Sequence, residues 1–299
     1  MNTNLSVLRS LLLCFFLSSC QSQEHAIIAK GAKVTLVSAG FEFTEGPAVD
    51  KKGNVFFTDQ PNDRIMKWSA EDNTVSVYMQ PSGRSNGLYF DNTGNLLSCA
   101  DEKNQLWSID QQKNVTILVD GFEGKKLNGP NDLWVDTKGG IYLTDPFYKR
   151  PWWSHLTPEQ ETKRVYYLSS DQKELRIVAE GFIQPNGIIG TPDGKTLYIA
   201  DIGDNKTYSY HIKKDGSLTN KSLFTEMGSD GMTIDDEGNV YLTGDGVTVF
   251  NTKGEQIQHI PIQQKWTANV TFGGKNQKML FITAMNSVYV LDMNVNGVR

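Results

Sequence analysis

The sequence has little of several features that mark particular protein classes. Its 299 residues include 3 Cys and 4 His, and no stretch is rich in lysine and arginine. The net charge of −5 offers no attraction for a phosphate backbone, so we expect no nucleic-acid partner. With 38% apolar and 21% charged residues, the composition is that of a folded globular chain and excludes disorder, collagen and coiled coil.

Long apolar runs are also absent, apart from one near the N-terminus. Residues 11–17 follow Arg9 and are too few to span a bilayer, which is typical of an export signal. The run ends in Leu17-Ser18-Ser19-Cys20, which resembles the bacterial lipobox. We therefore expect a lipoprotein signal peptide at 1–19, a lipid on Cys20 and a tether at 20–32. The alternative is a plain signal peptide with an accidental cysteine.

This N-terminus predicts an exported protein that touches a bacterial membrane only through its lipid anchor. Ser22 stands near the anchor without the aspartate that retains lipoproteins at the inner membrane, which favours the outer membrane and periplasm. Cys14 leaves with the signal, so Cys99 is the remaining thiol and no internal disulfide is expected. Cys99 lies in an apolar strand pattern and is expected to be a buried packing residue.

A repeated segment runs through the rest of the chain. Each copy has an apolar stretch, a turn rich in Asp, Asn and Gly, and a second apolar stretch. This pattern predicts a β-hairpin, because Gly and Asn readily adopt the backbone of tight turns. A second apolar pair follows each hairpin, as at 164–168 and 175–179. The hairpins begin at Gly46, Gly87, Asp132, Gly187, Gly231 and, in a degenerate copy, Val270.

The repeat predicts an all-β fold, a six-bladed β-propeller of four-stranded antiparallel blades over residues 33–299. The 224 residues from Glu45 to Asn269 cover five intervals, which gives a period near 45 residues. A ring of blades must close, because an open edge would expose unpaired backbone groups. We expect an N-terminal strand at 33–38 to complete the last blade beside 287–292, with almost no helix and no second domain.

One position of the repeat carries a side-chain oxygen in every copy. The innermost strand of each propeller blade lines the central channel, so equivalent side chains at its start converge at one mouth. Hard cations such as Ca²⁺ bind about six to eight oxygen ligands. The pattern therefore predicts a divalent-cation site that suits Ca²⁺ better than Zn²⁺. We call the six residues the ring residues: Glu45, Asn86, Asn131, Asn186, Asp230 and Asn269.

A structural role is the alternative for each single ring residue. Asn-Gly and Asp-Gly pairs are common turn formers. Glu45-Gly46 is not a favoured turn pair, however, which supports a ring over a set of turns. A different set of aspartates closes the second strand of four copies and is expected to hydrogen-bond the next turn: Asp59, Asp101, Asp145 and Asp201.

Five short motifs span the repeats: Glu45-Gly46-Pro47, Asn128-Gly129-Pro130-Asn131-Asp132, Thr144-Asp145-Pro146-Phe147-Tyr148, Pro185-Asn186-Gly187 and Ser229-Asp230-Gly231-Met232. Together they resemble the motifs of the gluconolactonase/regucalcin family of six-bladed propeller lactonases. The resemblance runs from about residue 33 to the end. It departs where regucalcin has an arginine and this chain has Gly129, and in the eroded sixth copy.

The resemblance implies hydrolysis of sugar lactones and related esters with a divalent ion, Ca²⁺ or else Zn²⁺, Mg²⁺ or Mn²⁺, in the channel. It implies metal ligands at Glu45, Asn186 and Asp230, and a further ligand or substrate contact at Asn131. Asn86 is expected to contact substrate and Asn269 to support the ligands from behind.

The chemistry expected of such a site needs no Ser/His/Asp pattern, and the histidines form none. A bound cation polarises a lactone carbonyl. Asp230 is then the expected general base for the attacking water, with a nucleophilic role less favoured. Two alternatives remain on the same ring. One is a phosphoesterase or fluorophosphatase-like hydrolase, since diisopropyl fluorophosphatase has a similar Glu/Asn/Asn/Asp set; the other is a non-catalytic ligand-binding propeller with a structural cation.

One loop is longer than the repeat requires. The interval from Asn131 to Asn186 is 55 residues, and the surplus falls in 147–159 and its flanks. The loop leaves the mouth that carries the ring, so we expect it to overhang the site. Tyr148 and His155 are then expected to contact substrate, with Lys149 and Arg150 placed to pair a substrate carboxylate. The alternative is an aromatic loop that only packs on the fourth blade.

Overall fold

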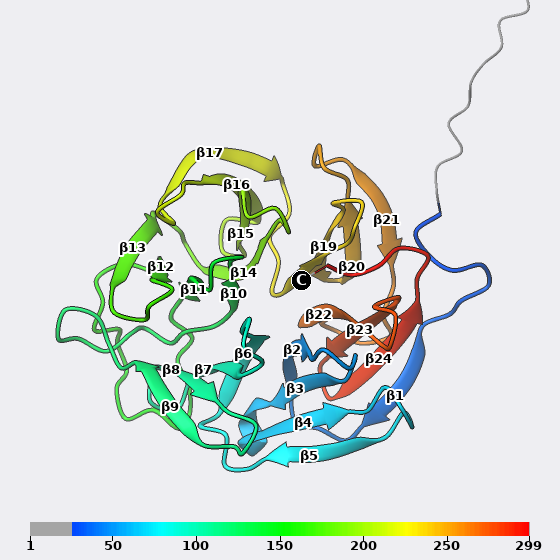
Figure 1. Cartoon of the computed structure of the whole chain (residues 1–299), viewed down its shortest axis with the longest axis horizontal. Helices are drawn as coiled ribbons and strands as arrows, with labels where there is room; N and C mark the ends of the chain where they lie inside the picture. Colours follow the sequence, from blue (N-terminus) through cyan, green and yellow to red (C-terminus); the bar gives the residue numbers. More distant parts are fainter. Residues whose placement is uncertain (1–25, 299) are drawn as a thin grey trace, which may run out of the picture.

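The computed structural model describes residues 26–298, which form six four-stranded antiparallel sheets around a central axis (Figure 1). The predicted all-β, six-bladed propeller is confirmed. One short 3₁₀ helix, Gln60–Asn62, is the sole helical element of the described residues. No helical segment within 26–298 has the length and apolar content needed to cross a membrane.

Each blade runs from an inner strand at the axis to an outer strand at the rim. The first consists of β2 (Thr44–Val49), β3 (Val55–Asp59), β4 (Arg64–Trp68) and β5 (Val75–Met79). The second consists of β6 (Ser85–Phe90), β7 (Leu96–Ala100), β8 (Gln105–Ile109) and β9 (Val115–Val119). The third consists of β10 (Leu133–Val135), β11 (Ile141–Asp145), β12 (Arg164–Leu168) and β13 (Leu175–Glu180).

The remaining blades follow the same order except in the last. The fourth consists of β14 (Pro185–Gly190), β15 (Thr196–Asp201), β16 (Lys206–Ile212) and β17 (Leu218–Thr225). The fifth consists of β18 (Met232–Ile234), β19 (Val240–Gly244), β20 (Gly246–Phe250) and β21 (Gln256–Ile260). The sixth consists of β22 (Asn269–Gly273), β23 (Met279–Ala284), β24 (Ser287–Asp292) and β1 (Thr35–Ala39).

The outer strand of the sixth blade comes from the beginning of the described chain. β1 pairs antiparallel with β24, with Thr35 opposite Val290. The preceding residues also pack on this blade, because Ile27 is buried and Ile28 forms an isolated bridge with Met293. The described part of the predicted tether, 26–32, therefore contacts the propeller. The predicted signal peptide and Cys20 lie outside the described residues.

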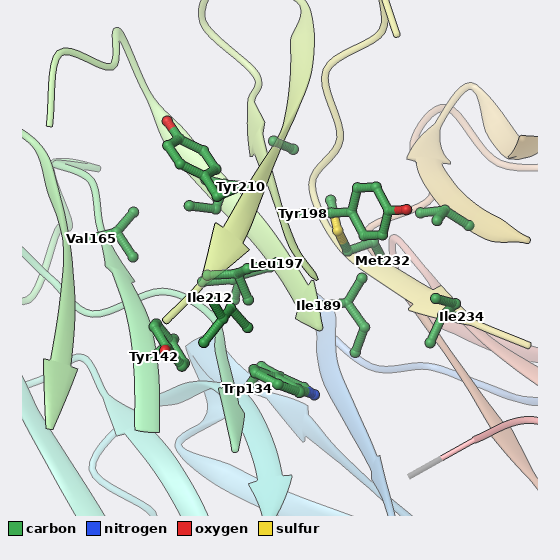
Figure 2. Close-up of a cluster of buried hydrophobic side chains, with 14 of the residues drawn as sticks. Trp134, Tyr142, Val165, Ile189, Leu197, Tyr198, Tyr210, Ile212, Met232 and Ile234 are labelled. Carbon is green, nitrogen blue, oxygen red and sulfur yellow. The ribbon is translucent and has the colours of Figure 1, made fainter. Parts of the chain in front are cut away.

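The hydrophobic core fills the spaces between neighbouring sheets. Figure 2 shows one such cluster, in which Trp134 and Tyr142 of the third blade face Ile189 and Leu197 of the fourth. β10 and β14 approach closely because Gly190 has no side chain, and a Cβ there would overlap the indole of Trp134. Cys99 is fully buried in another cluster, which confirms its predicted packing role.

The C-terminal segment crosses the face on which the inner hairpins turn. Asn296 donates from Nδ2 to Asp236 Oδ2 at 2.6 Å, and the Gly297 amide donates to the Gln277 carbonyl at 2.8 Å. Val298, the last described residue, packs against the cluster of Figure 2, and the C-terminal segment approaches the centre of the ring (Figure 1). The turn face of the channel is therefore partly covered by the protein's own C-terminus.

Candidate active site

The six ring residues lie where the inner strands begin, as the repeat register predicts. Four of them are in strands β2, β6, β14 and β22, while Asn131 and Asp230 come just before β10 and β18. The amide of Gly87, which follows Asn86, donates to the Asn131 carbonyl of the next blade at 2.8 Å, so the inner strands of these two blades are in direct contact at the ring. All are buried except Asp230, which is partly exposed.

The glycine that follows most ring residues serves close packing rather than a turn. A Cβ on Gly87 would lie 2.8 Å from Asp132 Oδ1, and a Cβ on Gly231 would overlap the Asn269 side chain. Neither glycine has a positive φ. The Asn-Gly and Asp-Gly pairs are therefore not turns, and glycine is needed at these positions because neighbouring inner strands approach closely.

On one side of the ring, Asn186 and Asp230 are tied together. Asn186 Nδ2 donates to Asp230 Oδ1 at 2.7 Å and to the Tyr148 hydroxyl at 2.9 Å. Trp266 Nε1 donates to Asp230 Oδ2 at 2.6 Å. These bonds fix the carboxylate that sequence reasoning assigns as the base. Trp266 was not foreseen, because it lies between blades, outside the repeat.

On the other side, Asn269 connects Glu45 to an acid that sequence reasoning missed. Its Nδ2 donates to Glu45 Oε2 at 3.2 Å and approaches Asp132 Oδ2 at 3.5 Å across the channel. The Gly46 amide also donates to Glu45 Oε2, at 2.7 Å. Asp132 had a usable signal: it begins the third hairpin, where the first two copies have glycine.

Burial makes the three channel carboxylates reluctant to ionise. It raises the pKa of Asp132 to about 7 and, against hydrogen bonds from Trp266 and Asn186, that of Asp230 to about 6. Burial and then the charge of Asp230 raise the pKa of Glu45 well above its usual range. None of the ion pairs found in the described part of the chain involves these three side chains.

The ring fits a divalent cation by its donor chemistry. The buried Oδ1 atoms of Asn86 and Asn186 accept no hydrogen bond from any described residue, and an unsatisfied buried oxygen is costly. These oxygens would bind a divalent cation, and the cation would be the positively charged partner that the carboxylates lack. Within 26–298, no three His, Cys, Asp or Glu side chains are grouped to hold a metal by themselves. A cation here would therefore depend on the amide oxygens.

The aspartates that close the second strands are structural in three blades. Asp59, Asp145 and Asp201 each accept two backbone N–H groups, such as those of Asn128 and Gly129 on Asp145 at 2.9 and 2.8 Å. These amides belong to the loop that leads into the same blade. Of the three, Asp59 also bonds the next turn as expected, accepting from Asn62 Nδ2 at 2.9 Å.

The second blade departs from this arrangement. Asp63 takes the loop amides there, accepting from Ser82 N at 2.9 Å and Arg84 N at 2.7 Å. Asp101 is thereby released and accepts instead from Arg150 Nε, in the long loop of the third blade, at 2.7 Å. The repeat gave no sign of this exchange, because Asp101 has the same sequence position as the other three.

The long loop has two parts with different surroundings. Tyr148 reaches the ring through its bond with Asn186. His155 stacks on Trp153 with ring centres 4.7 Å apart, and Trp153 Nε1 donates to the Asp101 carbonyl at 2.7 Å. Trp153 packs over Gly129, where a Cβ would lie 2.8 Å from its ring. The substrate roles of Tyr148 and His155 stay predictions.

A cavity of about 1070 Å³ lies on the turn side of the ring. Its walls come from the later parts of the inner strands, and it extends into the groove between the first two blades. Asp132 and Asn269 line it, and so does Val298 of the C-terminal segment. The channel is therefore hollow beneath the ring residues.

Comparisons with known proteins identify relatives over most of the chain. A sequence model of the SMP-30/Gluconolactonase/LRE-like region matches residues 43–286, which include all six ring residues. Gluconolactonase of Zymomonas mobilis is 28% identical over 300 residues, covering 88% of this chain and 82% of that protein. Diisopropyl-fluorophosphatase of Loligo vulgaris is 25% identical over 292 residues, covering 88% and 93%. A solved gluconolactonase structure from Xanthomonas campestris has a TM-score of 0.83 at 29% identity, covering 89% and 91%.

Proposed function

The chain belongs to the SMP-30/gluconolactonase/LRE-like family, and from this premise we propose that it is a divalent-metal-dependent lactonase that opens sugar lactones of the gluconolactone type. The similarity to the gluconolactonases of Zymomonas mobilis and Xanthomonas campestris supports the reaction class. The proposal of a metal rests on the ring, which combines buried amide oxygens that accept no hydrogen bond with buried carboxylates that have no cationic partner.

We propose that Glu45, Asn186 and Asp230 would hold the ion. Asn131 would be a further ligand or a substrate contact, and Asn86, whose Oδ1 is unsatisfied, would contact the substrate. When bound, a divalent cation polarises the lactone carbonyl and stabilises the oxyanion that forms on attack by water. An all-oxygen set with two carboxylates favours Ca²⁺ over Zn²⁺, while Mg²⁺ and Mn²⁺ also accept such donors.

The protein side of the mechanism centres on Asp230. Its two oxygens each accept one hydrogen bond, from Asn186 and Trp266, and each keeps a further lone pair, which leaves one for the ion and one for a water molecule. With a pKa near 6 in the metal-free protein, the carboxylate is ionised at neutral pH and takes the proton of the attacking water. Tyr148 holds Asn186 from above through its hydroxyl. Asn269 anchors Glu45 on the opposite side.

The test is hydrolysis of glucono-δ-lactone and a panel of other lactones and aryl esters, followed by proton release above the spontaneous rate. We expect EDTA-treated protein to be inactive and to recover when Ca²⁺ is added. Parallel additions of Zn²⁺, Mg²⁺ and Mn²⁺ identify the working ion. Absence of turnover across the panel with every metal would overturn the assignment.

A fluorophosphatase-like hydrolysis is the second candidate. The observation that favours it is the similarity to diisopropyl-fluorophosphatase, which covers 88% of this chain. Diisopropyl fluorophosphate in the same assay, followed by fluoride release, separates the two candidates. A rate above that for every lactone would make cleavage of the phosphorus–fluorine bond the principal reaction.

We also propose that the mature protein is a lipoprotein held at the bacterial outer membrane through Cys20. The lipobox-like sequence before Cys20 supports this proposal. Cells labelled with a radioactive fatty acid should yield a labelled protein in the membrane fraction, and the Cys20→Ala variant should be unlabelled. Equal labelling of both proteins would contradict the anchor.

A further inference from the structure

A buried ion pair connects the long loop of the third blade to the second blade. Arg150 Nε donates to Asp101 Oδ2 at 2.7 Å, and the two side chains are 20% and 2% exposed. Gln60 Nε2 donates to the same oxygen at 3.1 Å. Burial raises the pKa of Asp101 to about 6 although the Arg150 charge lowers it, so Asp101 is ionised at neutral pH. The pair is therefore a fixed contact and not a solvent-exposed one.

Aromatic rings hold the guanidinium of Arg150 in place. Its central carbon lies 5.5 Å from the ring centre of Tyr148 and 5.7 Å from that of Trp152. Trp152 also carries a second guanidinium, that of Arg84, at 4.6 Å. Stacked guanidinium groups lose little further freedom when they bind a ligand, so this arrangement is prepared for recognition.

The hydrogen-bonding edge of Arg150 is only partly used. A guanidinium has five N–H donors, and Asp101 takes the one on Nε. No hydrogen bond from either Nη atom to another described residue is found. The Nη1/Nη2 edge therefore has donors available for a ligand, and its geometry matches the two oxygens of a carboxylate.

Arg150 also lies beside the proposed reaction site. Tyr148, over which it stacks, accepts a hydrogen bond from the ring residue Asn186. The positive charge of Arg150 lowers the pKa of Asp230, so its field reaches the proposed base. Arg150 is thus connected to the ring through a single aromatic side chain, that of Tyr148.

We propose that Arg150 binds a carboxylate on the substrate, and that the preferred substrates are sugar lactones that carry an acidic group. This inference rests on the proposed lactonase function. Asp101 acts as a positioning residue, since it holds Nε and leaves the two Nη groups for the carboxylate. Arg84 adds a second positive charge beyond Trp152, opposed by the half-exposed Glu102 at 4.0 Å.

The experiment compares two lactones that differ at one group. D-glucaro-γ-lactone carries a carboxylate where D-glucono-γ-lactone carries a hydroxymethyl group, and both have the same lactone ring. We expect the metal-loaded protein to have a higher kcat/KM for the glucarolactone. In Arg150→Lys, this kcat/KM should fall by about 10-fold to 100-fold, because a lysine bound to Asp101 offers no second edge. The gluconolactone value should fall by a smaller factor, so the ratio of the two kcat/KM values is the readout.

Two further variants guard against a folding defect. Removing Arg150 alone would leave the Asp101 carboxylate buried and unpaired. The double variant Asp101→Asn/Arg150→Met removes both charges of the ion pair and should show the same selective loss. Lys125→Met removes an equal charge from an exposed side chain and should change neither rate. Equal losses on both lactones in the Arg150 variants, or no loss on either, would overturn the inference.

The outcome separates this inference from the proposed function. If the unaltered protein turns over neither lactone, the lactonase assignment fails, and calorimetric binding of glucarolactone then tests Arg150 directly. Tighter binding to the unaltered protein than to Arg150→Lys supports the carboxylate site, and equal binding overturns it. If gluconolactone alone is hydrolysed, the lactonase assignment stands and the acidic substrate class is overturned.

Discussion

The two ends of the central channel are built from the same six inner strands, and their acidic residues behave differently. At the turn end, Asp91 accepts amide hydrogen bonds from Thr93 and Asn95 at 2.9 and 2.8 Å, and Asp235 accepts from Glu237 and Asn239 in the same way. These carboxylates close their own turns. At the ring end, the carboxylates bond instead to side chains from other blades. Burial raises the pKa of Asp235 as well as those of Glu45, Asp132 and Asp230, so the hydrogen-bond partners, and not the pKa values, distinguish the two ends. The difference separates acids that build blades from acids available for chemistry.

The largest expected difference is between the two ends when the same substitution, aspartate to asparagine, is made at each. Asp230→Asn should lower kcat for lactone hydrolysis by at least about 100-fold, because an amide cannot take the proton of water. Asp91→Asn should leave kcat within about twofold and cost some stability. Initial rates and thermal melts of both variants make the comparison. Similar rates in the two variants would remove the distinction between the two ends.

Metal affinity should also depend on the ring end alone. Glu45→Gln keeps the shape of the side chain and removes one of the proposed charged ligands, so the Kd for Ca²⁺ should rise by about 10-fold or more. Calorimetric titration of EDTA-treated protein measures this change. The matched control is Asp235→Asn at the turn end, which should bind Ca²⁺ as the unaltered protein does. An unchanged Kd in Glu45→Gln would place the ion elsewhere.

The stability of the metal-free protein should fall as pH rises from about 4 to 7. The folded-state pKa values of Asp132 and Asp230 are raised to about 7 and about 6, so the folded protein binds more protons than the unfolded chain in this window. The stabilisation is complete below the unfolded pKa and is lost as each group ionises. Ca²⁺ binds the ionised form and should reduce the loss. Melting temperatures in EDTA and in Ca²⁺ across this range test the sign. A melting temperature in EDTA that rises with pH would contradict it.

The smallest effect on stability and activity is expected in the C-terminal segment that crosses the turn end of the channel. Val298→Ala removes part of a partly buried side chain, which should lower stability by about 1 kcal/mol and the melting temperature by about 2–4 °C. Lactone turnover should stay within about twofold, because the ring lies at the other end. A large loss of activity in this variant would show that the turn end takes part in catalysis.

Much of the fold and the ring could be predicted because both follow the repeat. The period located each hairpin, and the register placed an oxygen-bearing residue at every inner strand. The structural role of the glycines could not be predicted in the same way. An Asn-Gly pair has the same sequence whether the glycine forms a turn or allows a neighbouring strand to approach. The structure decides this through the contact of Gly231 with Asn269.

The residues that sequence reasoning missed are those that interrupt the repeat. Asp132 replaces a glycine of the hairpin, and Trp266 lies between blades. Asp101 has the position of a structural aspartate and was assigned as one, but Asp63 takes over its backbone contacts. Asp101 then pairs with Arg150 of the third blade, a tertiary contact that no local pattern records.

The most direct test of the account is the turnover of glucono-δ-lactone by EDTA-treated protein during titration with Ca²⁺. The account predicts no activity above the spontaneous rate at the start, and activity that rises as one equivalent of Ca²⁺ binds. In Glu45→Gln the same curve should shift to higher Ca²⁺ concentration. Full turnover in EDTA, or a rise that Glu45→Gln leaves unshifted, would contradict the ring as the catalytic metal site.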